Sequence, residues 1–433
     1  MKNVRIKSRL LLSLLLIAML AFSLNTSAKV YYVDSMQGND AETGTVMKNA
    51  WKSLINVNSH NFKPGDTICF HRGGVWVGGL IINSSGNNHF PIVYSAYGEG
   101  PNPVIKNPGS DKAVAININA KWIVVENFLV REAHAAGIDI NAGAEHNIIR
   151  KNEATKVGIG IAVHGDHNLI TRNYAHDLTM VRNTKGGDDD FGAVGIWLFS
   201  SGNEVSYNRM INCKAPSFDY GSDGGVVEFY GDVDSCYVHH NYGENCDGAF
   251  EIGGQGETVS HNVIAYNVFV NNGVAGGFHV GGKFGVIVED MRIENNVFLD
   301  TIHSDYAIGF WNGVPHPGNF AYRNNIFYIP NYQRVSNDPG FIHENNLYFL
   351  EGKKDIGITP GPGEKIADPL FRNVNEKDFH LSPGSPAIDA GKDLKYTKDF
   401  EGKKVPEGSA PDIGAFEFYT KSVDKSDIKG NNK

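Results

Sequence analysis

A short motif recurs along the middle of the chain and restricts the possible folds more than any other feature. It consists of alternating apolar residues followed by Asn, as in IIRKN, VSYNR, IAYNVF and IENNVF. Successive motif Asn residues lie 21 to 35 residues apart, and they are Asn127, Asn152, Asn173, Asn208, Asn241, Asn267, Asn296, Asn325 and Asn346. A common minimum spacing, with extra residues in some repeats, is typical of a solenoid of short strands in which loops of different length lie on one face.

A second motif lies between these Asn residues. It is a Gly-rich entry followed by an alternating strand, as in GIGIAVHG, AVGIWLFSS, GGVVEFYG, GAFEIGG and GGFHVGG. Each rung therefore has at least two short strands, separated by corners of Gly and Asn. Asn at a corner tolerates positive φ and can bond its stacked neighbour, so we expect a ladder of Asn side chains. The 50 Gly residues among 433 fit this arrangement and argue against a helical bundle or a coiled coil.

Together these motifs resemble the right-handed parallel β-helix of pectate-lyase-like, exported carbohydrate-active enzymes. The opening YYVDSMQGND…WKSL…FKPGDTICFHRGGVW is similar to the start of such bacterial enzymes. The tail ADPLF…HLSPGSPAIDAG…DIGAFE resembles the segment that often closes these helices. The resemblance implies an all-β fold and a polysaccharide or oligosaccharide partner. It leaves the reaction open, because lyases, hydrolases and epimerases share the scaffold.

The chain divides into three predicted parts. Residues 1–28 are typical of a secretory signal peptide, with four basic residues, an apolar run over 10–22 and a small-residue end. That run is too short for a confident membrane span, so we expect a secreted or periplasmic protein without one. Residues 29–418 form the β-helix, with core rungs over about 110–350 and caps over 29–60 and 365–418. Residues 419–433 form a flexible tail. We expect a monomer, and the net charge of −9 argues against nucleic-acid binding.

Side chains of the Gly-entry strands should alternate between the core and the exterior. The inward pairs begin with Ile138/Ile140 and Ile161/Val163 and extend to Phe278/Val280 and Ile308/Phe310. The residues between them should form an outward column of Asp139, Ala162, Trp197, Glu228, Glu251, His279 and Gly309. The two longest rungs, 173–208 and 208–241, each carry roughly ten extra residues beside this column. Long loops that border an exposed polar column are the expected walls of a cleft.

Glu228 and Glu251 are 23 residues apart, which is about one rung. Stacked strands would place their carboxyls ~5 Å apart, the separation of a retaining glycosidase pair. Two close carboxylates also raise the pKa of one of them, which supplies the catalytic acid. His279 would bind a sugar hydroxyl or tune Glu251, and this chemistry requires no cofactor. The candidate substrate-binding residues are Trp197, Tyr230, Trp311, Asp190, Asp223 and Asp247.

Two alternatives remain open. The first is a Ca²⁺-dependent uronan lyase acting by β-elimination, with Asp188, Asp189 and Asp190 as candidate Ca²⁺ ligands. Its base would be Lys185, Lys283 or His279. No outward strand position in the central rungs is Lys or Arg, which favours hydrolysis. The second alternative is a glycan-binding β-helix without catalysis, which gives no reason for two Glu residues on neighbouring rungs.

The four cysteines do not suggest a disulfide scaffold or a zinc site. Cys213 and Cys246 each lie five residues after a motif Asn, so they should stack on adjacent rungs. Such a stack fits either a disulfide or a reduced pair. Cys69 and Cys236 are expected in the core.

Overall fold

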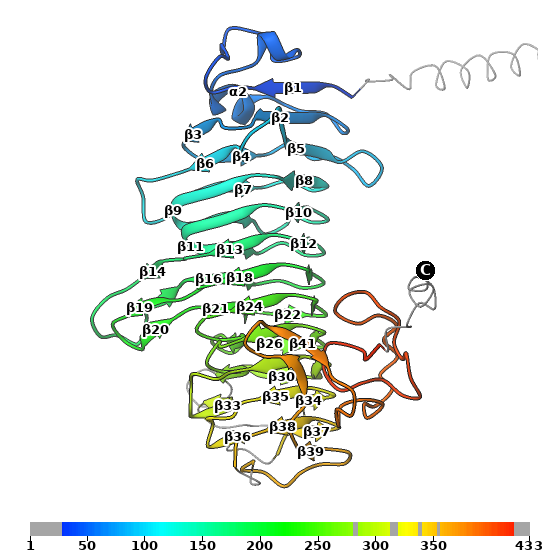
Figure 1. Ribbon diagram of the computed structural model, residues 1–433. Coiled ribbons are helices and arrows are strands. Elements are labelled where there is room, and N and C mark those ends of the chain that lie inside the picture. Colours follow the sequence, from blue (N-terminus) through cyan, green and yellow to red (C-terminus); the bar gives the residue numbers. More distant parts are fainter. Residues whose placement is uncertain (1–27, 280–284, 312–318, 337–339, 353–355, 420–433) are drawn as a thin grey trace, which may run out of the picture.

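The computed structural model describes residues 28–279, 285–311, 319–336, 340–352 and 356–419, and it shows a right-handed parallel β-helix (Figure 1). The predicted all-β fold is confirmed. The signal peptide lies outside the described residues except for Ala28, and the predicted tail does so except for Tyr419. In the part of the chain that is described, no helix has both the length and the apolar character that crossing a membrane requires.

Three walls of parallel strands enclose the interior. The first wall is a twelve-stranded sheet within the described residues. In spatial order its strands are β1 (Val30–Val33), β2 (Thr67–His71), β5 (Ile92–Tyr97), β8 (Ile123–Glu126), β10 (Ile148–Arg150), β12 (Leu169–Thr171), β17 (Glu204–Ser206), β23 (Tyr237–His239), β27 (Val263–Ala265), β31 (Met291–Glu294), β34 (Phe320–Arg323) and β37 (Ile342–Glu344).

The second wall carries the Gly-entry strands, and the third wall carries the strands that follow the ladder Asn residues. The second wall consists of β4 (Leu80–Ile82), β7 (Val114–Ile118), the ends of β9 (Leu129–Ile140) and β11 (Glu153–Val163), β16 (Val194–Leu198), β21 (Gly225–Tyr230), β25 (Phe250–Gly253), β29 (Gly276–His279), β33 (Tyr306–Trp311) and β36 (Arg334–Ser336). The third consists of β3 (Val75–Val77), β6 (Val104–Lys106), the starts of β9 and β11, β13 (Tyr174–His176), β18 (Arg209–Ile211), β24 (Tyr242–Glu244), β28 (Val268–Val270), β32 (Val297–Leu299), β35 (Ile326–Tyr328), β38 (Leu347–Phe349) and β39 (Lys365–Ile366).

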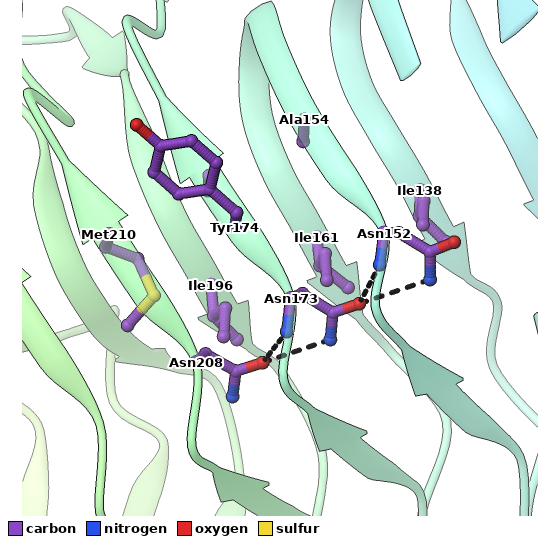
Figure 2. Close-up of a pocket in the computed structure, with 10 residues that line it drawn as sticks. Ile138, Asn152, Ala154, Ile161, Asn173, Tyr174, Ile196, Asn208 and Met210 are labelled. Atoms are coloured by element: carbon purple, nitrogen blue, oxygen red, sulfur yellow. Dashed lines mark hydrogen bonds between the residues drawn. The ribbon is translucent and has the colours of Figure 1, made fainter. Parts of the chain in front are cut away.

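A ladder of buried Asn side chains joins successive rungs, as predicted (Figure 2). The backbone N–H of Asn152 donates to Oδ1 of Asn173 at 3.1 Å, and Asn173 donates likewise to Asn208 at 2.9 Å. The same pattern continues to Asn346. Asn127 is not a member, because the adjacent residue Phe128 donates to Asn152 instead. Positive φ belongs to the residue before each ladder Asn rather than to that Asn itself.

Residues 29–60, the segment expected to form the N-terminal cap, contain β1 and two short helical elements. A 3-10 turn, η1 (Met47–Asn49), precedes the helix α2 (Leu54–Ser59). Ser53 caps this helix by accepting a hydrogen bond from the backbone N–H of Ile55 at 3.2 Å. Leu54 and Val57 are buried against the first rungs.

The C-terminal segment covers the side of the helix as well as its end, which corrects the expectation of a cap alone (Figure 1). All three residues of β28, β32 and several neighbouring strands are apolar, so their outward side chains need cover. Phe379 and Leu381 of β41 (Asp378–Leu381) supply it with Ile413 and Ala415. β41 pairs with β40 (Phe371–Asn373) in an antiparallel hairpin.

All four cysteines are free thiols. The pairing of β18 with β24 brings Cys213 and Cys246 to adjacent rungs, where both are buried. Of the two predicted alternatives, the structure has the reduced pair. Cys236 is buried as expected, whereas Cys69 is partly exposed.

Candidate active site

Two hairpins project beside the second wall at the predicted insertions (Figure 1). The first joins β14 (Met180–Arg182) to β15 (Phe191–Gly192), and the second joins β19 (Ala215–Ser217) to β20 (Gly221–Asp223). The second hairpin leads directly into β21, which carries Glu228. A short three-stranded sheet of β22 (Val233–Asp234), β26 (Thr258–Ser260) and β30 (Ile287–Glu289) follows on the next rungs.

Asp190 holds the two hairpins together. Its Oδ2 accepts hydrogen bonds from Ser217 Oγ at 2.8 Å and from the backbone N–H groups of Phe218 and Asp219 at 2.8 and 3.0 Å. Its Oδ1 accepts from the N–H of Thr184. Asp190 is 5% exposed, so we assign it to the scaffold of the cleft wall rather than to the substrate.

The central prediction concerns Glu228 and Glu251, and the strand register confirms that they are direct neighbours. Glu228 pairs with Trp197 on one side and with Glu251 on the other. The column continues from Trp197 through Ala162 to Asp139, as expected. The predicted inward neighbours Val227, Phe229, Phe250 and Ile252 are buried in the core, so both Glu side chains face outward.

His279 is not the next member of this column. Glu251 pairs with Gly277, and His279 lies two residues further along β29, opposite Trp311. Its side chain nevertheless reaches back, since Nε2 lies 3.0 Å from Glu251 Oε1. Trp311 is described in its backbone alone. Val280 and the candidate base Lys283 lie outside the described residues.

Glycines surround the two carboxyls. Gly225 precedes Glu228 on β21, and Gly248 precedes Glu251 just before β25. Gly253 follows Glu251 at the next outward position of β25, and Gly277 lies opposite Glu251 on β29. A Cβ built on Gly225 would lie 3.3 Å from Glu228 Oε1, so the missing side chain makes room for the carboxyl. The positions next to the Glu pair therefore present backbone rather than side chains.

The surroundings of Glu228 favour its protonated form. Burial, followed by the negative charges of Glu251, Asp223 and Asp247, raises its pKa well above the ordinary value. Burial and the charge of Glu251 also raise the pKa of Asp223 to about 7, against the opposing hydrogen bond from Gly224. Burial raises the pKa of Asp247. The neighbour of Glu251 on its other side is the imidazole of His279.

Aromatic side chains flank the Glu pair on its N-terminal side. Trp197 and Tyr230 lie in edge contact, with ring centroids 5.6 Å apart. Phe199 contacts both, at 4.7 and 6.0 Å. Trp197 is 7% exposed, so the expectation of an open indole face is wrong: the indole packs on Ala162 and Ile159, and Tyr230 is the more accessible ring.

The three acidic residues of the first hairpin, Asp188, Asp189 and Asp190, have different partners. Asp188 accepts a hydrogen bond from Tyr220 Oη at 3.0 Å, whereas Asp189 pairs with Arg182. The carboxylates of Asp189 and Asp190 come within 4.8 Å of that of Asp219, a residue the sequence reasoning did not associate with a metal. Lys185 lies over the Phe218 ring in the same hairpins.

Comparison with known proteins supports the fold. No family model matches the chain. Over 90 residues, 19% of the chain, it is 37% identical to a lacto-N-biosidase of Bifidobacterium longum subsp. longum, and this match spans 6% of that protein.

Two solved structures match almost the whole chain. A pectate lyase, Pel9A, superposes with a TM-score of 0.57 at 18% identity, covering 91% of this chain and 97% of its own. XylC in complex with xylose superposes with a TM-score of 0.56 at 12% identity, covering 90% and 99%. At these identities the similarity shows the fold alone. The chain has the parallel β-helix fold, as its motifs indicated.

Proposed function

We propose that the protein is a carbohydrate-active enzyme that hydrolyses glycosidic bonds, with Glu228 as the acid and Glu251 as the nucleophile. The observation that carries the proposal is the pairing of these two residues on neighbouring strands in opposite surroundings. Glu228 lies among acidic groups whose charges favour its protonated form, whereas Glu251 has the imidazole of His279 at 3.0 Å from Oε1. Two carboxyls with separated protonation states are what acid-assisted glycoside cleavage requires.

The geometry supports a retaining reaction. Neighbouring strands lie ~4.8 Å apart, which agrees with the ~5–5.5 Å between the carboxyls of retaining enzymes. Glu251 attacks the anomeric carbon while Glu228 protonates the leaving oxygen. The ionised Glu228 then takes a proton from the water that hydrolyses the glycosyl-enzyme. Tyr230 offers a ring face to a bound sugar beside this pair.

The lacto-N-biosidase similarity supports hydrolysis, because that relative is a glycoside hydrolase. A lyase is the second candidate, favoured by the pectate lyase fold match and by the carboxylate group of Asp189, Asp190 and Asp219. Among the described residues this is the one metal-compatible acidic group, and it lies in the hairpins rather than at the Glu pair. Arg182 and the hairpin N–H groups already engage two of its members. We therefore favour hydrolysis without a metal.

The same proposal includes a polysaccharide or oligosaccharide substrate, an exported location through residues 1–28, and a monomeric state. If the protein only bound glycans, the strongly raised pKa of Glu228 would have no role.

Turnover of a glycan panel by the wild type, Glu228→Gln and Glu251→Gln tests the proposal. Each variant should lose about 10²–10⁴-fold in kcat, since each removes an acid–base or nucleophilic group. Glu99→Gln, an exposed matched change, should keep full activity. Products should gain one water, as measured by mass spectrometry. An unsaturated uronate product or loss of activity with EDTA would establish the lyase instead, and unchanged turnover in both Gln variants would exclude the two-carboxylate mechanism.

A further inference from the structure

A row of rings runs beside the column that carries the Glu pair. His164, Phe199 and Tyr230 lie two residues beyond Ala162, Trp197 and Glu228 on three consecutive strands, so they face outward together. His164 stacks on Phe199 with centroids 4.2 Å apart and planes at 18°, and Phe199 contacts Tyr230 at 6.0 Å. We call these three residues the ring ledge. It leads from the Glu pair toward the N-terminal rungs.

Two buried polar atoms beside the ring ledge have no hydrogen-bond partner. They are Nε1 of Trp197, a donor, and Oδ1 of Asp139, an acceptor. Trp197 is 93% buried, being 7% exposed, and the nearest cation to Asp139 is His164 Nε2 at 3.7 Å. An unpaired buried polar atom is costly, so native proteins rarely keep two in one column without a use.

The two atoms belong to residues of one outward column, two strands apart. Asp139 and Trp197 are separated by Ala162, whose methyl group leaves room between them. The Trp197 indole belongs to an apolar cluster outside the core that also contains Ala136, Ile159 and Ala162. Asp139 is 17% exposed, so rotation of its carboxylate can present Oδ1 to the cleft.

We propose that the ring ledge, Asp139 and the Trp197 indole N–H form a second sugar subsite, on the N-terminal side of the Glu pair. This inference rests on the proposed function and extends it to substrate length and charge. One sugar unit packs against the outward side of the ring ledge, donates a hydroxyl hydrogen bond to Asp139 and accepts one from Trp197 Nε1. The occupant is an uncharged unit, because the acidic side chains of Asp139 and Glu251 border the subsite and repel a uronate.

Binding to the inactive full-length Glu228→Gln protein tests this subsite directly. The probes are neutral cello-, xylo- and N-acetylchito-oligosaccharides of increasing length, with oligogalacturonates as the charged comparison. Affinity measured by calorimetry should rise with the length of at least one neutral series. Adding Phe199→Ala or Asp139→Asn should weaken binding of the longer members about tenfold. Phe199→Tyr should retain the affinity, since it keeps the ring.

Phe90→Ala serves as the control, because Phe90 is 60% exposed in the loop before β5 of the first wall. It should leave the affinity unchanged. Absence of binding to every neutral series, affinity independent of length, or equal binding by the Phe199 and Asp139 variants would each overturn the subsite. Failure of the proposed function is distinguishable, since it would appear as normal turnover by Glu228→Gln itself.

Discussion

Replacing Asp223 with Asn should stabilise the protein in alkaline solution and leave it unchanged in acid. Asp223 ends β20 beside the Glu pair, where burial and the charge of Glu251 raise its pKa from 3.8 to about 7. A carboxyl with a raised pKa binds its proton more tightly in the folded state. Its contribution to stability is therefore complete below pH 3.8 and is lost as the pH rises through about 7.

The size of the effect follows from the shift. About three pKa units correspond to about 4 kcal/mol, and partial solvent exposure of Asp223 screens some of this. An unfolding entropy of ~2.1 cal/mol/K per residue over about 390 residues gives about 0.8 kcal/mol per degree. Removing the charge should then raise the thermal midpoint by about 2–5 °C at pH 8.

Thermal unfolding of the wild type and Asp223→Asn at pH 4 and pH 8 checks this expectation. Asp111→Asn, an exposed loop substitution, is the matched control and should shift neither midpoint. The pH–rate profile gives a second readout: its alkaline limb should move to lower pH, because Glu228 loses a negative neighbour. An equal shift at both pH values, or a destabilised variant at pH 8, would refute the electrostatic reasoning.

Three further outcomes are expected. Gly225→Ala should lower kcat/KM about tenfold with an unchanged thermal midpoint, because its Cβ would lie 3.3 Å from Glu228 Oε1 and displace that carboxyl. Asn241→Ala should lower the midpoint by about 2–5 °C, because the buried N–H of Asn208 loses its acceptor. Proteolysis within residues 389–418 should be faster at pH 8 than at pH 5, since Asp412 and Glu417, with pKa raised by burial to about 6 and 7, ionise between them.

The motif spacing was sufficient to predict the fold and the register of the site as far as Glu251, and it failed at the next rung. There the apolar alternation suggested that Phe278 stacks on Phe250, whereas Phe278 pairs with Ile252. Gly276 and Gly277 carry no side chains, so no apolar pattern marks the strand register before Phe278. The space at Gly276 is filled by the Phe250 ring and by Tyr322, a residue from a distant strand. A local sequence pattern cannot predict that side chains from other strands fill the space at a glycine.

The position of the C-terminal segment was missed for a different reason. The runs VFV and VFL in β28 and β32 are apolar on both faces, which indicates that something covers their outer side. The pattern does not say what covers it. The contacts that decide it are long-range, such as the one from His240 Nε2 to the carbonyl of Asp399 at 2.9 Å.

The rung spacing also restricts the chemistry that this column can perform. Backbone hydrogen bonds fix neighbouring strands ~4.8 Å apart, so outward residues in one column are separated by whole multiples of that distance. Adjacent rungs give the short separation of a retaining pair, and two rungs give about 9.6 Å, at the upper end of the inverting range. Because Glu228 and Glu251 occupy adjacent rungs, the pair leaves little room for an attacking water between them. The anomeric configuration of the first product, measured by NMR, therefore reports on the strand register: net retention agrees with Glu228 beside Glu251, whereas inversion would require a different second carboxylate, with Asp223 and Asp247 the nearest alternatives.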